Sequence, residues 1–319
     1  MPDLLILRRW LIWLVLALAV FNLCWERFSR IDVKTSQALD ILALVAALAL
    51  AVVVTGRMSI RDTGRASVWR LLQRLSEGGM FLVFAWSNLR LFNHITFSVP
   101  MPLADDLLID MDRWFGFDWT AYFDLVMHYP TLIWILDLSY GKLDYVSAAA
   151  LLLLLLIGSA DRSRFFIEAF FVTAIIAASV GWILPAKAAV ATLIGDVSAV
   201  ADLPRSAGTY HLSHMDRLRN PVGDIRLDLF RMPGLITFPS FHTAAGVVIA
   251  FAFWRTLLFV PAALYSATMI AATPIFGGHY FVDLIVGALL AAAVIAALLL
   301  HPQNREIFAR PVLAAPDTA

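Results

Sequence analysis

Long apolar runs separated by short polar segments make up most of this chain. A helix of about 20 apolar residues spans the hydrocarbon core of a bilayer, and most of the runs approach that length. The pattern therefore predicts an all-α fold, a polytopic membrane bundle of about eight transmembrane helices. The third run is the least regular, because it contains Asn88, Arg90 and His94. The runs cover residues 10–24, 38–55, 78–97, 131–157, 166–185, 243–260, 262–277 and 281–300.

The composition agrees with this interpretation. Hydrophobic residues make up 61% of the chain and charged residues 15%, and the mean hydropathy is +0.80. The formal net charge is zero, which argues against a nucleic-acid-binding protein. The single cysteine, Cys24, excludes an intramolecular disulfide. No small-residue cleavage site follows the first run, so we expect a retained membrane anchor and not a removed signal peptide.

Arginines indicate the orientation of the bundle, because cytoplasmic loops are enriched in Lys and Arg. Segment 57–74 contains five arginines, and a short turn later in the chain contains Arg162 and Arg164. A cytoplasmic N-terminus places all of them inside. The same topology places His242 and His279 together on the non-cytoplasmic face. We therefore expect an integral membrane protein, of the inner membrane if the cell is bacterial, with an outward-facing site.

The chain divides into three expected parts. Residues 1–76 form an N-terminal two-helix membrane region with a basic cytoplasmic segment, residues 77–302 form a catalytic membrane domain, and residues 303–319 form a disordered tail. Within the second part, the acidic and aromatic stretch 100–130 suits short helices lying at the membrane interface. The simpler interpretation is that this stretch is an amphipathic lid that takes no part in the chemistry. The stretch 186–236 is a polar, basic loop that precedes the first histidine.

The first histidine cluster has the signals of a helix start. Pro239 ends any upstream helix, and Ser240 is a favoured N-cap, so a helix should begin near Phe241. The first backbone N–H groups of that helix, from Phe241 to Thr243, would point outward and form an anion pocket. His242 lies within this first turn, where an imidazole can protonate a departing alkoxide as a general acid.

The second cluster follows 37 residues later, an interval of about two membrane crossings. His279 and Asp283 are spaced i, i+4, which places them on one face if both lie in a helix. The aspartate would fix the tautomer of the imidazole and leave its other nitrogen free to attack. Gly277 and Gly278 allow close approach of backbone or substrate. Together the two clusters predict phosphoryl transfer at a membrane surface.

These clusters resemble the second and third signature motifs of the type 2 phosphatidic acid phosphatase (PAP2) superfamily. The wording Phe-Pro-Ser-Phe-His-Thr and Gly-His-Tyr-Phe-Val-Asp is similar to the branch that includes inositol phosphorylceramide synthases. The resemblance implies a PAP2-like core of six helices and a metal-free, cofactor-free reaction. It implies that His279 is the nucleophile that forms a phosphohistidine, that Asp283 orients it, and that His242 is the acid for the leaving group.

The chain departs from the superfamily pattern in its phosphate-holding cations. The first motif, a lysine followed by Arg-Pro, is not recognisable, and Ala272 and Thr273 stand where Ser-Arg usually opens the third motif. A phosphate dianion in a low-dielectric pocket needs compensating charge. Arg219 and Lys187, both in the polar loop, are our candidates for it. Each is otherwise a solvated side chain or one that faces lipid headgroups.

The fourth run contains charged residues that are costly inside a membrane. Asp137, Tyr140 and Asp144 share one face if the run is a single helix, and Lys142 lies between them. We expect Asp137 and Tyr140 to border the site or a bound headgroup. The alternative is a mutually neutralising structural pair.

The reaction has open alternatives. Water as the second substrate gives a lipid phosphatase, and a ceramide-like or polyprenyl hydroxyl gives a headgroup transferase. A rival metal site would use His242, His279 and Asp283 as ligands. A transporter would use the charges of the fourth run as an ion path, but the repeats that such folds contain are not visible. The expected partners are a lipid phosphate and an acceptor alcohol, and the sequence does not indicate an oligomeric state.

Overall fold

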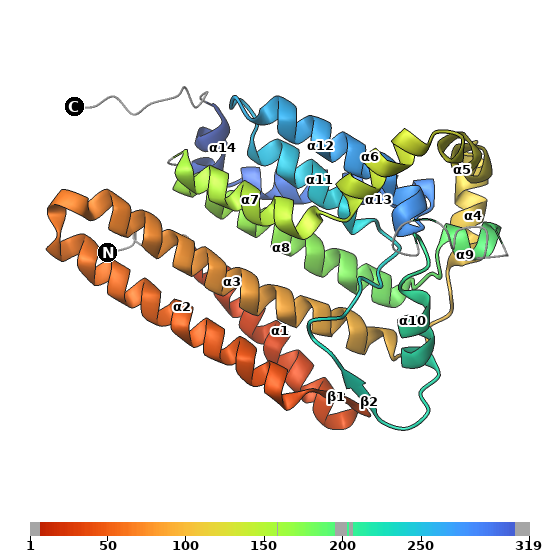
Figure 1. Ribbon diagram of the computed structural model, residues 1–319, viewed down its shortest axis with the longest axis horizontal. Coiled ribbons are helices and arrows are strands. Elements are labelled where there is room, and N and C mark those ends of the chain that lie inside the picture. The colour runs from red at the N-terminus through yellow and green to blue at the C-terminus, as the bar shows by residue number, and fades with distance from the viewer. Residues whose placement is uncertain (1–6, 158, 195–202, 204–206, 310–319) are drawn as a thin grey trace.

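The computed structural model describes residues 7–157, 159–194, 203 and 207–309. The described chain is mostly helical, as predicted, and the helices run mainly along the long axis of the molecule (Figure 1). The helices are α1 (Arg9–Phe28), α2 (Thr35–Arg61), α3 (Ala66–Phe97), α4 (Asp105–Trp114), α5 (Trp119–Met127), α6 (Pro130–Tyr140), α7 (Leu143–Leu156), α8 (Ala160–Ile183), α9 (Ala189–Leu193), α10 (Leu212–Arg219), α11 (Phe241–Ala252), α12 (Phe259–Ala272), α13 (Phe281–Leu299) and α14 (Pro302–Ala309).

Two short strands are an exception to the all-α prediction. Strand β1 (Ile31–Val33) follows α1 and pairs in parallel with β2 (Ile225–Leu227) from the polar loop. Lys34 and Asp228 form an ion pair of 2.7 Å just beyond the strands, and Gln37 donates to the same carboxylate. The loop before the first histidine cluster is therefore fastened to the N-terminal helices.

Five described helices are long and apolar enough to cross a membrane, namely α1, α2, α8, α13 and the segment Phe259–Gly277. The pair α6 and α7 counts as a sixth if it is one bent span. The predicted number of eight is thus not confirmed. Helix α3 contains polar residues such as Gln73 and Glu77, which are buried in the bundle, and α11 has only 12 residues.

Two of the apolar runs fold differently from expectation. The run 131–157 is not one helix, because the chain bends by 58° between α6 and α7. Asp137, Tyr140 and Asp144 therefore do not share one helical face. The run 243–260 ends as a helix at Ala252, where the buried guanidinium of Arg162 donates to the backbone carbonyl oxygen at 3.1 Å.

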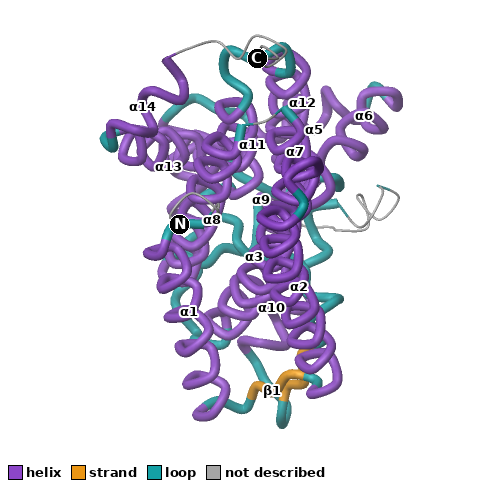
Figure 2. Tube along the Cα trace, turned by 90° about the vertical axis from the view of Figure 1, so that its left-hand side faces the viewer, coloured by secondary structure: helices purple, strands orange, loops and turns teal. Residues whose placement is uncertain are grey.

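Helix α3 links the two halves of the bundle. It packs against α1 and α2 on one side and against α7 and α8 on the other. In Figure 2, α1 to α3 occupy the lower part of the molecule, and α11 to α14 the upper part. The 32 residues of α3 continue without a break through the expected boundary at 76–77. The N-terminal helices are therefore joined to the remainder by a continuous, packed helix.

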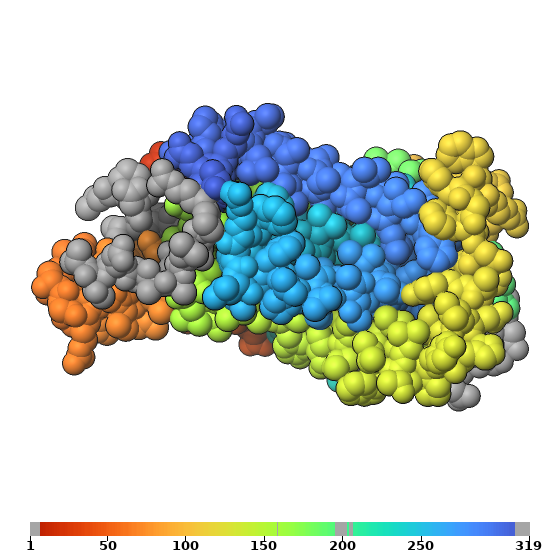
Figure 3. Space-filling model, turned by 90° about the horizontal axis from the view of Figure 1, so that it is seen from above, coloured from red at the N-terminus to blue at the C-terminus, as the bar shows by residue number. Residues whose placement is uncertain are grey.

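The ends of the molecule differ in what they contain. Helices α4 and α5, from the acidic stretch, lie at one end of the molecule (Figures 1 and 3), where α4 packs against α13. Helix α14 lies at the other end. The tail expected to be disordered from residue 303 begins instead in this helix, where Asn304 and Phe308 are buried. Residues 310–319 lie outside the described residues.

Candidate active site

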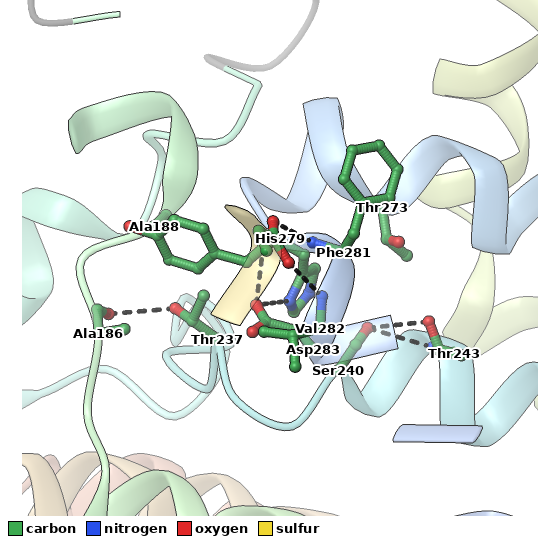
Figure 4. A network of polar contacts seen from close by, with 12 residues as sticks. Ala186, Ala188, Thr237, Ser240, Thr243, Thr273, His279, Phe281, Val282 and Asp283 are labelled. Carbon is green, nitrogen blue, oxygen red and sulfur yellow. Dashed lines mark hydrogen bonds and ion pairs between the residues drawn. The ribbon is translucent and has the colours of Figure 1, made fainter. Parts of the chain in front are cut away.

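His279 and Asp283 are in contact, but the local structure differs from the prediction. The Nδ1 atom of His279 lies 3.2 Å from Oδ2 of Asp283, and both side chains are buried. Helix α13 begins only at Phe281, so His279 precedes the helix and Tyr280 is its N-cap. Oδ2 of Asp283 also accepts the backbone N–H of Tyr280 at 3.0 Å. The contact therefore comes from a capping interaction and not from a shared helical face (Figure 4).

The remaining N–H groups at the start of α13 bind a second carboxylate. Asp112 of α4 accepts from Phe281 N at 2.9 Å and from Val282 N at 2.7 Å. Burial raises the pKa of Asp112, against the lowering effect of these two hydrogen bonds. The positive end of α13 is thus closed by protein carboxylates. It is not an anion-binding site, and its geometry holds His279 just outside the helix.

Asp105, seven residues before Asp112 on the same face of α4, fixes the other side of the site. Its carboxylate accepts from the backbone N–H of Lys187 at 2.9 Å and of Ala188 at 3.1 Å. It also accepts from the hydroxyl of Tyr280 at 2.9 Å. The acidic stretch is therefore not a cover without a role, because two of its carboxylates are buried and position the residues around His279.

The start of α11 follows the prediction closely. Ser240 is the N-cap, its Oγ accepts from Thr243 N at 3.3 Å, and the helix begins at Phe241. The backbone N–H groups of Phe241 and His242 have no acceptor among the described residues. Ser240 N donates to the carbonyl oxygen of Asp283 at 3.0 Å. This bond joins the two clusters directly, so the two histidines lie at the same end of the bundle.

Tyr140 lies close to both histidines. Its ring stacks on the ring of His242 with a centroid distance of 4.1 Å. A Cβ atom placed on Gly277 would lie 2.7 Å from the Tyr140 hydroxyl and 2.9 Å from Nε2 of His279. The hydroxyl and the ring nitrogen are therefore no farther apart than the sum of these two distances. Any side chain at position 277 would fill the space between them, so glycine is required here.

Gly278 is required for a different reason. It has a φ of +70°, in the left-handed region, and an added Cβ would lie 2.8 Å from Gly208 O. Its own carbonyl oxygen accepts from Ala189 N at 2.6 Å. The predicted close approach at the double glycine is thus an approach of protein backbone. Gly278 shapes the turn that carries His279.

Burial controls the charge of His279. Its pKa is lowered from 6.5 to about 4, because burial disfavours the imidazolium more than a hydrogen bond to the Thr237 backbone favours it. The pKa of the neighbouring His211 is also lowered to about 4 by burial. His279 is therefore neutral at physiological pH, the form in which a ring nitrogen can attack phosphorus.

A cavity of about 350 Å³ opens beside His242. Its wall comes from α3, α6, α7, α8 and α11 and from the segment 233–236. Most of the lining is apolar, which suits a lipid substrate. The polar side chains on the wall are those of Arg90, Asn93, Tyr140, Asp144, Tyr210 and His242.

The predicted phosphate-binding cations do not line this cavity. Arg219 donates to the carbonyl oxygen of Met101 at 2.7 Å. Lys187 contributes its backbone to the Asp105 and His211 contacts, and its side chain is exposed. Asp137 is partly buried on α6, and it is Asp144, one helix later, that lines the cavity. The four predicted candidates are Arg219, Lys187, Asp137 and Tyr140. Of these, only Tyr140 lies against His242.

The rival metal site is not supported. Among the described residues, no group of three or more His, Cys, Asp or Glu side chains has an arrangement that could hold a metal ion. Oδ2 of Asp283 already accepts from Tyr280 N and contacts His279.

Thr273, which replaces a motif arginine, is buried, and its carbonyl oxygen accepts from His279 N at 3.3 Å.

A family model described as the PAP2 superfamily matches residues 106–297, more than half of the chain. The chain belongs to the PAP2 superfamily. The resemblance found in the sequence is thereby confirmed at the level of the superfamily. Searches among curated proteins and among solved structures give no match.

The PAP2 match begins in α4 and ends in α13, so it contains both histidine clusters and Asp112. Helices α1, α2 and α3 precede it. Membership in the PAP2 superfamily and the long apolar helices fit an integral membrane protein of a phosphatase-type family.

Proposed function

We propose that this protein is an integral-membrane lipid phosphatase or phosphotransferase that works through a phosphohistidine. In the first step, the lone pair on Nε2 of His279 attacks phosphorus and forms an N–P bond. The P–O bond to the lipid alcohol breaks, and His242 donates a proton to the departing oxygen. Asp283 accepts the hydrogen bond from Nδ1–H of His279, so the hydrogen stays on Nδ1, and the carboxylate stabilises the positive charge that develops on the ring.

The second step reverses the roles. His242, now neutral, removes the proton from a hydroxyl as its oxygen attacks phosphorus. The N–P bond breaks, and its electron pair returns to Nε2 of His279. His242 ends protonated, as it began. Burial and the nearby His279 lower the pKa of His242 to about 3, and a phosphate dianion bound beside the ring raises that pKa and so favours the protonated form. Water as the attacking molecule gives a phosphatase, and a lipid alcohol gives a transferase.

The observation that carries this proposal is the neutral, buried His279 held by Asp283 beside His242. A nucleophile needs an unprotonated nitrogen and a fixed tautomer. Burial of the His279 ring favours the first condition, and the contact of Nδ1 with Asp283 favours the second. The joined starts of α11 and α13 support convergence on a single phosphorus atom. The motif wording favours a headgroup transferase similar to inositol phosphorylceramide synthases as the second candidate. The apolar lining of the cavity suits either lipid.

Trapping of the covalent intermediate tests the mechanism. Purified protein is incubated with lipids labelled at phosphorus and quenched, and acid-labile label on the protein is measured. We expect wild type to carry label, His279→Ala to carry none, and Asp283→Asn to gain it orders of magnitude more slowly because the imidazole loses its orienting partner. His128→Ala is the matched control, since His128 is an exposed histidine just after α5, and this variant should behave as wild type. Label and turnover in His279→Ala would overturn the nucleophile assignment.

The role of His242 needs a second substrate pair. His242→Ala should form the phosphoenzyme slowly from a lipid phosphoester but at nearly the wild-type rate from a nitrophenyl ester, whose leaving group needs no proton. Equal losses on both esters would contradict the general-acid role. Wild-type protein, assayed with and without acceptor alcohols, distinguishes the phosphatase reaction from the transferase reaction, since hydrolysis releases free phosphate and transfer yields a new lipid.

A further inference from the structure

The cavity beside His242 has a wall that the PAP2 match does not include. Arg90 and Asn93, one turn apart on α3, both line it. The matched range starts only at residue 106. The superfamily's own phosphate-holding cations are missing from the expected positions, so the charge that a bound phosphate requires has to come from another part of the chain.

Asn93 has an unused donor in this wall. Its side chain is buried, with 5% of its surface exposed. Oδ1 accepts from Leu235 N at 3.0 Å, which fixes the orientation of the amide. Nδ2 has no hydrogen-bond partner among the described residues. Leaving a buried N–H group without an acceptor is unfavourable, so this amide is suited to a ligand that brings an acceptor oxygen.

Arg90 supplies positive charge next to that amide. Its guanidinium lies 5.8 Å from the centre of the Trp86 ring, which holds it against the cavity wall. It has no carboxylate partner within 4 Å among the described residues, and Asp144, the carboxylate that lines the cavity, belongs to α7. Arginine binds phosphate oxygens through paired N–H groups. Arg90 is the arginine that lines the cavity containing His242.

We propose that Arg90 and Asn93 of α3 bind the non-transferred oxygens of the substrate phosphate and replace the cations of the missing motifs. This inference rests on the proposed function. Tyr140, which lines the same cavity and reaches toward Nε2 of His279, marks the position where the phosphate meets both histidines. Helix α3, which precedes the matched range, is thus part of the active site and carries its anion-binding residues.

Binding of orthovanadate and of inorganic phosphate tests this assignment without requiring turnover. Both anions should raise the melting temperature of the purified wild-type protein, and vanadate should inhibit it. In Arg90→Gln we expect the vanadate concentration for half-maximal effect and the KM for lipid phosphate to rise at least tenfold. Arg90→Lys should recover part of the loss, because the charge returns without the paired N–H geometry.

Asn93→Asp is the second variant. It keeps an oxygen for the Leu235 N–H and replaces the free donor by an acceptor, so anion binding should weaken while the fold is retained. Arg70→Gln is the matched control, since Arg70 is an exposed arginine on the same helix. Melting temperatures without anion report whether each variant is folded.

Three results would overturn the assignment. One is wild-type anion affinity in Arg90→Gln, another is equal weakening in Arg70→Gln, and the third is failure of both anions to stabilise the wild type. Failure of the proposed function has a different signature, because it appears as label and turnover in His279→Ala. An active enzyme with unchanged vanadate affinity in Arg90→Gln would retain the histidine chemistry and exclude α3 from phosphate binding.

Discussion

The reactivity of His279 depends on two local contacts and on burial. Asp283 occupies Nδ1, and the Gly277 backbone leaves open the approach to Nε2. Burial disfavours the protonated ring. The carboxylate alone would favour an imidazolium, and burial alone would leave the tautomer undefined. The combination gives a neutral ring with one defined free nitrogen.

This environment predicts an unusual pH dependence. The neutral form of His279 is active and its pKa is about 4, so the acidic limb of the activity profile should appear as the pH drops through about 4. A phosphodiester lipid should serve as substrate, since its charge stays constant over this range. We expect the acidic limb of kcat/KM near pH 4, with circular dichroism confirming that the protein is still folded. A limb near the ordinary histidine value of 6.5 would contradict burial of the ring.

At this scale the sequence predicted much of the site. His242, His279, Asp283 and the Ser240 cap follow from short motifs and helix-start signals, and the structure brings all four together. Proximity in sequence to the first cluster points to Arg219 and Lys187 as phosphate-binding cations, which the structure does not place at the cavity. Contacts across the bundle, such as that between Arg219 and Met101, cannot be read from such proximity.

Among the elements, α4 shows how a surface-like sequence becomes part of a site. Asp105, Leu108 and Asp112 recur at i, i+3 and i+7, a buried helical face. This spacing was visible in the sequence. The four other aspartates of the same stretch obscured it, since a strip rich in carboxylates is typical of solvent exposure. Only the packing of α4 against α13 shows which two carboxylates are buried.

Asp112→Asn tests the contribution of α4. The amide keeps one acceptor for two backbone N–H groups and removes the negative charge at the start of α13, so we expect a loss of about 1–2 kcal/mol in stability. Turnover should also fall, because His279 lies just before the helix that Asp112 caps. Thermal unfolding in detergent and kcat measure the two effects. Asp110→Asn, an exposed residue of the same helix paired with Arg113, should change neither.

On the scale of the whole molecule, Arg162 joins elements at the end remote from the histidines. Its fully buried guanidinium donates to the carbonyl oxygens of Trp254 at 2.7 Å and Ile307 at 3.2 Å, and it lies 4.6 Å from the Phe308 ring centre. It therefore connects the end of α11 to α14. The sequence placed Arg162 in a basic cytoplasmic turn, and hydropathy alone gave no sign that it would be enclosed.

Arg162→Gln should destabilise the fold and spare the chemistry. Several buried carbonyl groups would lose a charged donor, so we expect the free energy of unfolding to fall by more than about 2 kcal/mol. Activity per folded molecule should stay near wild type, because the site is at the opposite end. Thermal unfolding and low-temperature kcat separate the two quantities. Arg113→Gln removes an exposed ion pair with Asp110 and should cost less than about 1 kcal/mol.

The PAP2 match begins only after α3, and this has a consequence for the comparison of relatives. The histidine chemistry and the wall that faces it come from parts of one chain that can diverge at different rates. Two homologues with the same Phe-Pro-Ser-Phe-His and Gly-His-Tyr-Phe-Val-Asp signatures can therefore prefer different headgroups. A chimaera that exchanges only the leading helices should carry selectivity from one parent and bond-breaking capacity from the other.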